Sequence, residues 1–127
     1  MNNYKVFQTW SMLRITYALV PILLGLDKFF ATGLIVDWSK YVSPDVMAYI
    51  PLTMAQFLMA IGIIEIIAGF VVWFAPRFGG YLVAAWLALI IVNLAMMHAF
   101  YDIIARDVVI AIGALALAML TQAIEEK

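Results

Sequence analysis

The sequence predicts an all-α integral membrane protein: one domain over residues 1–127, built as a four-helix bundle with a short interfacial helix in its first loop. Of the 127 residues, 68% are hydrophobic and 12% are charged. Soluble domains are about 45–50% apolar and about 25% charged. The apolar residues also gather into four stretches, each near the roughly 20 residues that a membrane span needs. This composition excludes a water-soluble globule, a disordered chain and a coiled coil.

Helix breakers separate the four predicted spans. Pro51 precedes the second span, and Pro76 with Gly79 and Gly80 separates the second from the third, since proline and glycine interrupt helices. Asp102 is a candidate N-cap for the fourth span. The predicted spans are residues 10–30, 54–74, 78–99 and 103–124.

The loop between the first two spans, residues 31–51, is too short for a domain and too mixed for a span. Its Ile35, Trp38, Tyr41 and Val42 recur at helical spacing. A short helix with its aromatic side chains at the level of the lipid headgroups would explain the pattern. A loop helix that only caps the bundle explains it equally well.

Charge distribution gives an orientation. Four spans place both termini on one side of the membrane. With the N-terminus inside, four basic residues lie toward the cytoplasm and three lie outside: Lys5, Arg14, Arg77 and Lys127 against Lys28, Lys40 and Arg106. The positive-inside rule therefore favours cytoplasmic N- and C-termini. We expect a multi-pass protein of the cell (inner) membrane.

The sequence argues against several kinds of functional site. The chain has no cysteine, which excludes disulfides, thiolate metal sites and iron–sulfur clusters. His98 is its one histidine, so no metal site is expected. Haem is also not expected, because the eight methionines fit lipid-facing or core positions better than axial ligation. The net charge of −1 offers no footprint for nucleic acid.

Glu65 is the most informative charge, since it falls near the middle of the second span. A charged group at the bilayer centre costs about 2.5–3.5 kcal/mol and usually faces a partner or a cavity. Glu65 is either a structural group, ion-paired or protonated, or a carboxyl that handles protons or binds a ligand. We expect it to face the bundle interior. Depth slightly favours Arg14 over Lys28 as its partner, although each cation alone could snorkel to an interface.

The topology brings further polar residues to the non-cytoplasmic face, above Glu65. They predict a polar pocket there, in which Lys28, Arg106 and Asp107 approach one another. The candidate ligand-binding residues are Lys28, Glu65, His98 and Arg106, with Arg14 and Asp107 as supporting charges.

The ordered set of motifs resembles the DoxX family of small four-span membrane proteins over residues 10–122. The motifs are Arg14, Gly25-Leu26-Asp27-Lys28-Phe29, Glu65-Ile66-Ile67-Ala68-Gly69, Pro76-Arg77-Phe78 and Arg106-Asp107. The resemblance implies that Arg14, Lys28, Glu65, Arg106 and Asp107 are the recurrent polar positions; His98 is outside the pattern. That family includes the small membrane subunit of a thiosulfate:quinone oxidoreductase, and other members are linked to redox stress, thiol metabolism or the assembly of membrane complexes.

Three functions follow as hypotheses. The first is a membrane subunit or accessory of a redox complex with a quinone pocket. There, Lys28, Arg106 or His98 would donate hydrogen bonds, Glu65 would supply protons, and Trp86 or Tyr101 would line the slot. The second is a proton- or ion-coupled transporter or channel, acting as an oligomer. The third is a scaffold or assembly factor without chemistry. The expected partners are the lipid bilayer and either further copies of the chain or a larger redox complex.

Overall fold

The computed structural model describes residues 3–29 and 37–126, and within these ranges the chain is helical without β-strands. Five α-helices and one 3-10 helix follow in the order α1 (Asn3–Asp27), η1 (Trp38–Tyr41), α2 (Pro44–Ala48), α3 (Met54–Phe74), α4 (Pro76–Met96) and α5 (Tyr101–Glu125). Helices α1, α3, α4 and α5 are long and apolar enough to cross a membrane. The all-α, four-span fold is therefore confirmed, and the chain is a multi-pass membrane protein.

The helix boundaries agree with the predicted spans to different degrees. The span predicted over residues 54–74 coincides with α3, whereas α1 begins seven residues before residue 10 and ends at Asp27; Phe30, the predicted end, lies outside the described residues. Pro76 does mark the boundary between the second and third spans, as the first residue of α4, because proline fits the first helical turn. Gly79 and Gly80, predicted to separate the same spans, lie inside α4. Asp102 lies in the first turn of α5, and Phe100 is the N-cap residue, so the predicted cap is wrong.

The turn between α4 and α5 explains why α4 stops at Met96, before the predicted residue 99. His98 and Phe100 both adopt positive φ, at 53° and 61°. This left-handed conformation cannot continue a right-handed helix, and it costs an L-residue about 1–2 kcal/mol.

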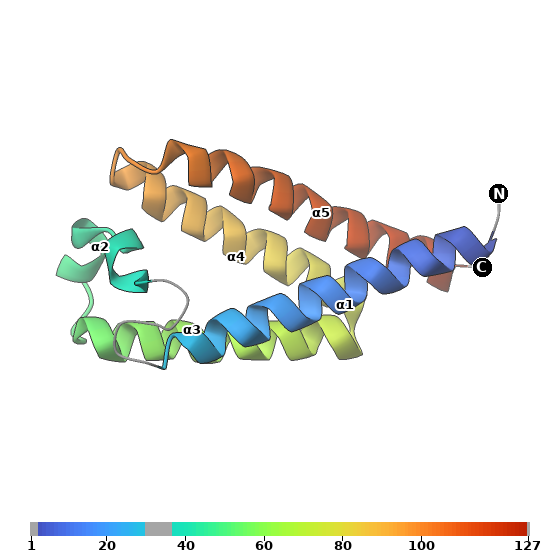
Figure 1. Cartoon of the computed structure of the whole chain (residues 1–127), viewed down its shortest axis with the longest axis horizontal. Coiled ribbons are helices and arrows are strands. Elements are labelled where there is room, and N and C mark those ends of the chain that lie inside the picture. The colour runs from blue at the N-terminus through green and yellow to red at the C-terminus, as the bar shows by residue number, and fades with distance from the viewer. Residues whose placement is uncertain (1–2, 30–36, 127) are drawn as a thin grey trace.

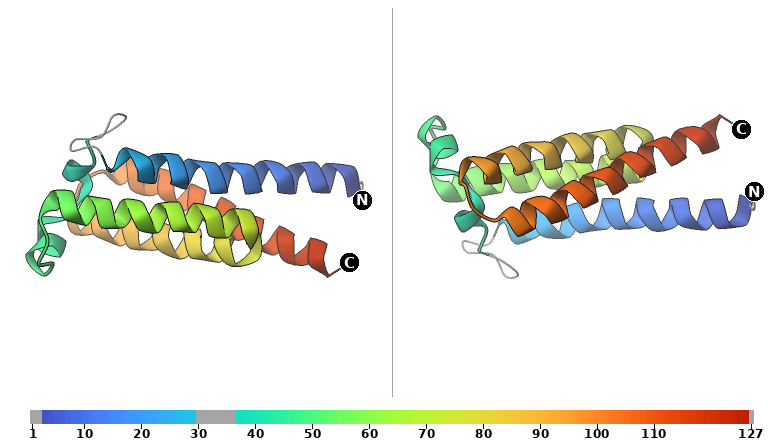
Figure 2. Two further views of the ribbon diagram at one scale, coloured as in Figure 1. Left: turned by 90° about the horizontal axis from the view of Figure 1, so that it is seen from below. Right: turned by 90° about the horizontal axis from the view of Figure 1, so that it is seen from above.

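The four long helices form a bundle. The N- and C-termini of the chain lie at one end of it, as predicted, while η1 and α2 lie at the other end (Figure 1; Figure 2). Within the bundle, α1 packs along α3 and α4 packs along α5. Glycine allows the first pair to approach closely: a Cβ atom on Gly62 would lie 2.6 Å from the carbonyl oxygen of Gly25, and one on Gly25 would lie 2.6 Å from that of Gly62. Gly69 meets the carbonyl of Ala18 in the same way.

The inside of the bundle holds small and branched apolar side chains, and its outside is apolar as well. The core consists of Ala18, Ala68, Val72, Val83, Ala114 and Leu117. Large apolar side chains that are more than half exposed include Met12, Ile67, Phe78, Leu89, Val109 and Met119. An apolar outer surface of this kind matches lipid rather than water.

The first loop is fastened onto the end of the bundle. Asp37 caps η1, since its carboxylate accepts hydrogen bonds from the backbone N–H and hydroxyl of Ser39; these bonds lower the pKa of Asp37. Asn93 of α4 holds the segment that follows: its Oδ1 accepts from the Ser43 N–H at 2.9 Å and its Nδ2 donates to the Tyr41 carbonyl at 2.6 Å.

Of the two explanations of the aromatic pattern in this loop, the structure supports one and leaves the other untested. The loop does cap the bundle, through the contacts of Trp38, Tyr41 and Ser43. The location of Trp38 and Tyr41 at the membrane interface stays a prediction, and Ile35 lies outside the described residues.

Asn93→Ala should loosen this cap. The substitution removes two hydrogen bonds and leaves half-buried backbone groups unpaired, which costs about 1–3 kcal/mol. Hydrogen–deuterium exchange of the amides of residues 38–48 should accelerate, while Val92→Ala, a neighbouring change on an exposed side chain, should leave it as in the native protein. Unchanged exchange in Asn93→Ala would show that the loop is held by other contacts.

Candidate functional site

The most distinctive polar feature is a buried ion pair between α1 and α3. Nζ of Lys28 lies 2.9 Å from Oε2 of Glu65, and the two side chains are only 7% and 10% exposed. Lys28 directly follows the last residue of α1. Gly62 makes room for it, because a Cβ atom there would already lie 3.3 Å from Cβ of Lys28.

Two tryptophans complete the surroundings of this pair. Nζ of Lys28 lies 3.7 Å from the centre of the Trp38 ring, a cation–π contact, and Nε1 of Trp38 donates to Oδ2 of Asp27 at 2.7 Å. Nε1 of Trp86 is buried beside the Glu65 carboxyl but forms no hydrogen bond of normal geometry with any described residue. We call Asp27, Lys28, Trp38, Glu65 and Trp86 the ion-pair cluster.

Glu65 faces the bundle interior, as predicted, but its partner is Lys28 and not Arg14. Nε of Arg14 donates to the carbonyl oxygen of Trp73 at 2.9 Å, and Nη2 donates to the same atom. The reason is the offset of the two antiparallel helices. Gly25 packs against Gly62 and Ala18 against Gly69, so Arg14 is level with Trp73, about 12 Å along α3 from Glu65 at 1.5 Å per residue.

Lys28, Arg106 and Asp107 were expected to approach one another; among the described residues Arg106 pairs with Asp107, and no ion pair joins Lys28 to either of them. The Arg106 side chain is 67% exposed, and its Nε lies 3.9 Å from Oδ1 of the buried Asp107. Neighbouring residues of a helix point about 100° apart, so Asp107 faces inward and Arg106 faces outward. Lys28 is committed to Glu65 instead.

His98 is also separate from the cluster. It is exposed, in the turn between α4 and α5. Of the four candidate ligand-binding residues, the structure thus joins Lys28 and Glu65, and it leaves Arg106 and His98 on the surface.

The sequence-based prediction missed two members of the cluster, Asp27 and Trp38. Asp27 was assigned no role, although an acid adjacent to Lys28 was a usable signal. Trp38 was treated only as an interfacial aromatic residue. Its contacts with residues 10 and 11 positions earlier depend on how the loop folds back, which helical spacing does not encode.

The cluster combines an acid, an ammonium group and an indole donor inside an apolar bundle. Such a set can hold or exchange a proton at the Glu65 carboxyl and can donate hydrogen bonds to an acceptor such as a carbonyl oxygen. Metal binding is a poorer match: among residues 3–29 and 37–126, no three His, Asp or Glu side chains are grouped for it.

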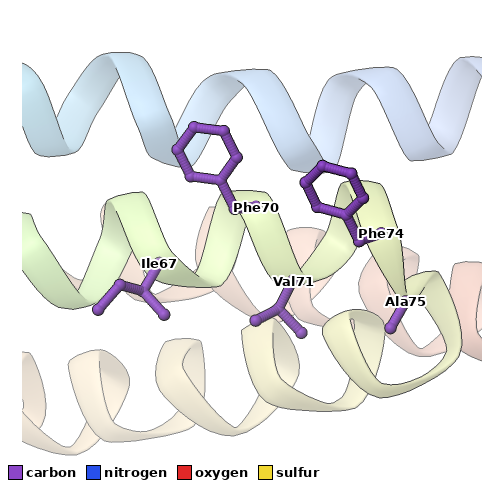
Figure 3. A pocket seen from close by; sticks show the side chains of 5 residues that line it. All are labelled: Ile67, Phe70, Val71, Phe74 and Ala75. Carbon is purple, nitrogen blue, oxygen red and sulfur yellow. The ribbon is translucent and has the colours of Figure 1, made fainter.

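A second feature is an apolar groove on the outer face of α3. It is lined by Ile67, Phe70, Val71, Phe74 and Ala75 (Figure 3). Phe70 and Phe74 point toward α1, and Ile67, Val71 and Ala75 lie nearer α4 (Figure 3).

Comparison with known proteins adds no family to these observations. No family model matches the chain, and neither a curated protein nor a solved structure is detectably similar to it.

Proposed function

We propose that this protein is a membrane subunit, or an accessory, of a quinone-linked redox complex, and that the ion-pair cluster receives the quinone head group. The observation that carries the proposal is the buried Lys28–Glu65 pair, with Nε1 of Trp86 buried beside the Glu65 carboxyl but without a hydrogen bond of normal geometry among the described residues. A buried donor that is so weakly bonded is rare in folded proteins, and an acceptor atom of a ligand would complete its hydrogen bond. The resemblance to DoxX proteins supports the redox class.

The residues of the cluster match the needs of a quinone head group. A bound quinone accepts electrons and takes up protons, and its carbonyl oxygens accept hydrogen bonds. Nε1 of Trp86 and Nζ of Lys28 are the donors that would orient a carbonyl oxygen. Glu65 is the group that would hold a proton, and the Lys28 ammonium stabilises its carboxylate once that proton has left.

The proposal also covers the membrane in which the protein lies and its orientation there. The protein lies in the cell (inner) membrane with both termini toward the cytoplasm, and the cluster lies toward the other face, near the end of α1 that is opposite the termini (Figure 1). His98 and Arg106, which are exposed, then belong to the surface around the site and not to its donors.

A short-chain benzoquinone titrated into the protein in lipid nanodiscs tests the proposal by isothermal calorimetry. We expect saturable binding, and we expect Trp86→Phe to raise Kd about tenfold, since a lost hydrogen bond is worth about 1.4 kcal/mol. Trp73→Phe is a matched change on α3 about 12 Å from Glu65, and it should leave the Kd of the benzoquinone unchanged.

No saturable binding, or equal affinity in Trp86→Phe and the native protein, would contradict the proposal. The first result would favour the alternatives. A proton- or ion-coupled transporter is favoured by a carboxyl within a span, and a scaffold is favoured by the closed geometry of the ion pair.

A further inference from the structure

Arg14 differs from the other two arginines of the chain because no acidic side chain among the described residues pairs with it. Arg77 lies 3.9 Å from Glu125, and Arg106 lies 3.9 Å from Asp107. Within the described ranges, Arg14 forms no ion pair with a carboxylate. A guanidinium group stays charged in proteins, and in membrane-spanning helices such charges pair with one another or with backbone carbonyls. A carbonyl leaves the net charge in place.

The contacts of Arg14 hold its guanidinium in place without neutralising it. Nε and Nη2 both donate to the carbonyl of Trp73, and the guanidinium carbon lies 5.0 Å from the ring centre of Trp10 and 4.4 Å from that of Trp73. Nη1 donates to no described residue, and Arg14 is only half-buried. Donors therefore remain for an external acceptor.

The depth of Arg14 suits one kind of acceptor. Its partner Trp73 is the next-to-last residue of α3. The 21 residues of α3 span about 31 Å at 1.5 Å per residue, and the hydrocarbon layer is about 30 Å thick. Arg14 thus lies at the edge of that layer, where lipid phosphates begin and where tryptophans concentrate.

The apolar groove lies beside this position. Phe74 directly follows Trp73, and Phe70 is one turn further toward the bilayer centre; both point toward α1, the helix that carries Arg14 (Figure 3). From residue 67 to residue 75 the groove follows α3 for about 12 Å. A charged site thus adjoins an open apolar groove that runs along α3 toward the bilayer centre.

From these observations we propose that Arg14 and the groove bind one anionic phospholipid, with its phosphate on the guanidinium and an acyl chain along α3. The net negative charge of the lipid supplies the missing counter-ion. A zwitterionic lipid brings its own ammonium group, which competes for the phosphate. This site is at the opposite end of the membrane layer from the Lys28 end of α1 and does not depend on the proposed quinone function.

Native mass spectrometry of the detergent-solubilised chain tests the proposal. With added dioleoyl phosphatidylglycerol, we expect one tightly retained lipid per chain, bound at least tenfold more strongly than dioleoyl phosphatidylcholine. Arg14→Gln should weaken retention of phosphatidylglycerol at least tenfold. Arg77→Gln, a matched change of an arginine at the same end of the bundle, should weaken it less than twofold.

Equal retention of the two lipids by the native protein would overturn the proposal, and this measurement needs no variant to fold. Equal losses in Arg14→Gln and Arg77→Gln would overturn it as well, because they would indicate attraction to charge in general. Inorganic phosphate at the same concentration should not displace the lipid; displacement would assign the site to a free anion.

Discussion

Lys28→Met should lower the free energy of unfolding by about 3–5 kcal/mol, the usual cost of leaving one member of a buried ion pair without its partner. The ammonium of Lys28 is the charged group 2.9 Å from Oε2 of Glu65, and both side chains are at least 90% buried. Water cannot replace it in a bundle surrounded by lipid. Equilibrium unfolding in mixed detergent micelles, followed by circular dichroism, measures the loss.

Two further variants test whether the loss of stability in Lys28→Met comes from breaking the ion pair. The double variant Lys28→Met, Glu65→Met should recover most of the lost stability, because apolar replacement of a whole buried pair is often neutral or stabilising. Arg77→Ala breaks a pair that is about half exposed and 3.9 Å long, so it should cost no more than about 1 kcal/mol. A double variant as unstable as Lys28→Met would contradict the ion-pair explanation.

The double variant also separates structure from function. If it is stable but no longer binds the benzoquinone, the pair serves the ligand, as proposed. If it is stable and still binds, the pair serves only to hold α1 against α3. The stability of the double variant ensures that loss of binding cannot be ascribed to unfolding.

Gly62→Ala should also be strongly destabilising, by about 1–3 kcal/mol, because it overfills a tight helix contact. The added methyl group would meet the carbonyl oxygen of Gly25 at 2.6 Å. That atom belongs to the backbone, so only a separation of α1 from α3 can relieve the clash. The same separation would pull Lys28 away from Glu65, and thermal unfolding in detergent should show a lower midpoint.

Gly113→Ala is the informative comparison for this change. Its methyl group would clash with the hydroxyl oxygen of Tyr17, which is the far end of a flexible side chain. The ring can move at the cost of its hydrogen bond to the Ile110 carbonyl, about 1 kcal/mol. If Gly62→Ala were the milder of the two, close approach of α1 and α3 would not be the factor that limits stability.

Much of the architecture could be predicted because it depends on the composition of each segment taken alone. Lipid accepts a helix of about 20 apolar residues wherever it occurs in the chain. The second span was therefore predicted over the same residues that form α3. The inward direction of Glu65 followed similarly from the cost of placing a charge in lipid, and Glu65 is indeed buried, together with Gly62 and Gly69.

The membership of the site, in contrast, was decided by tertiary contacts between distant residues. Depth along each span favoured Arg14 as the partner of Glu65, but the contacts of Gly25 with Gly62 shift α1 along α3 and bring Lys28 to the carboxyl. The rotation of α5 turns Arg106 outward. Single-helix periodicity contains neither the offset nor the rotation of one helix against another, because both are set where side chains of two helices fit together.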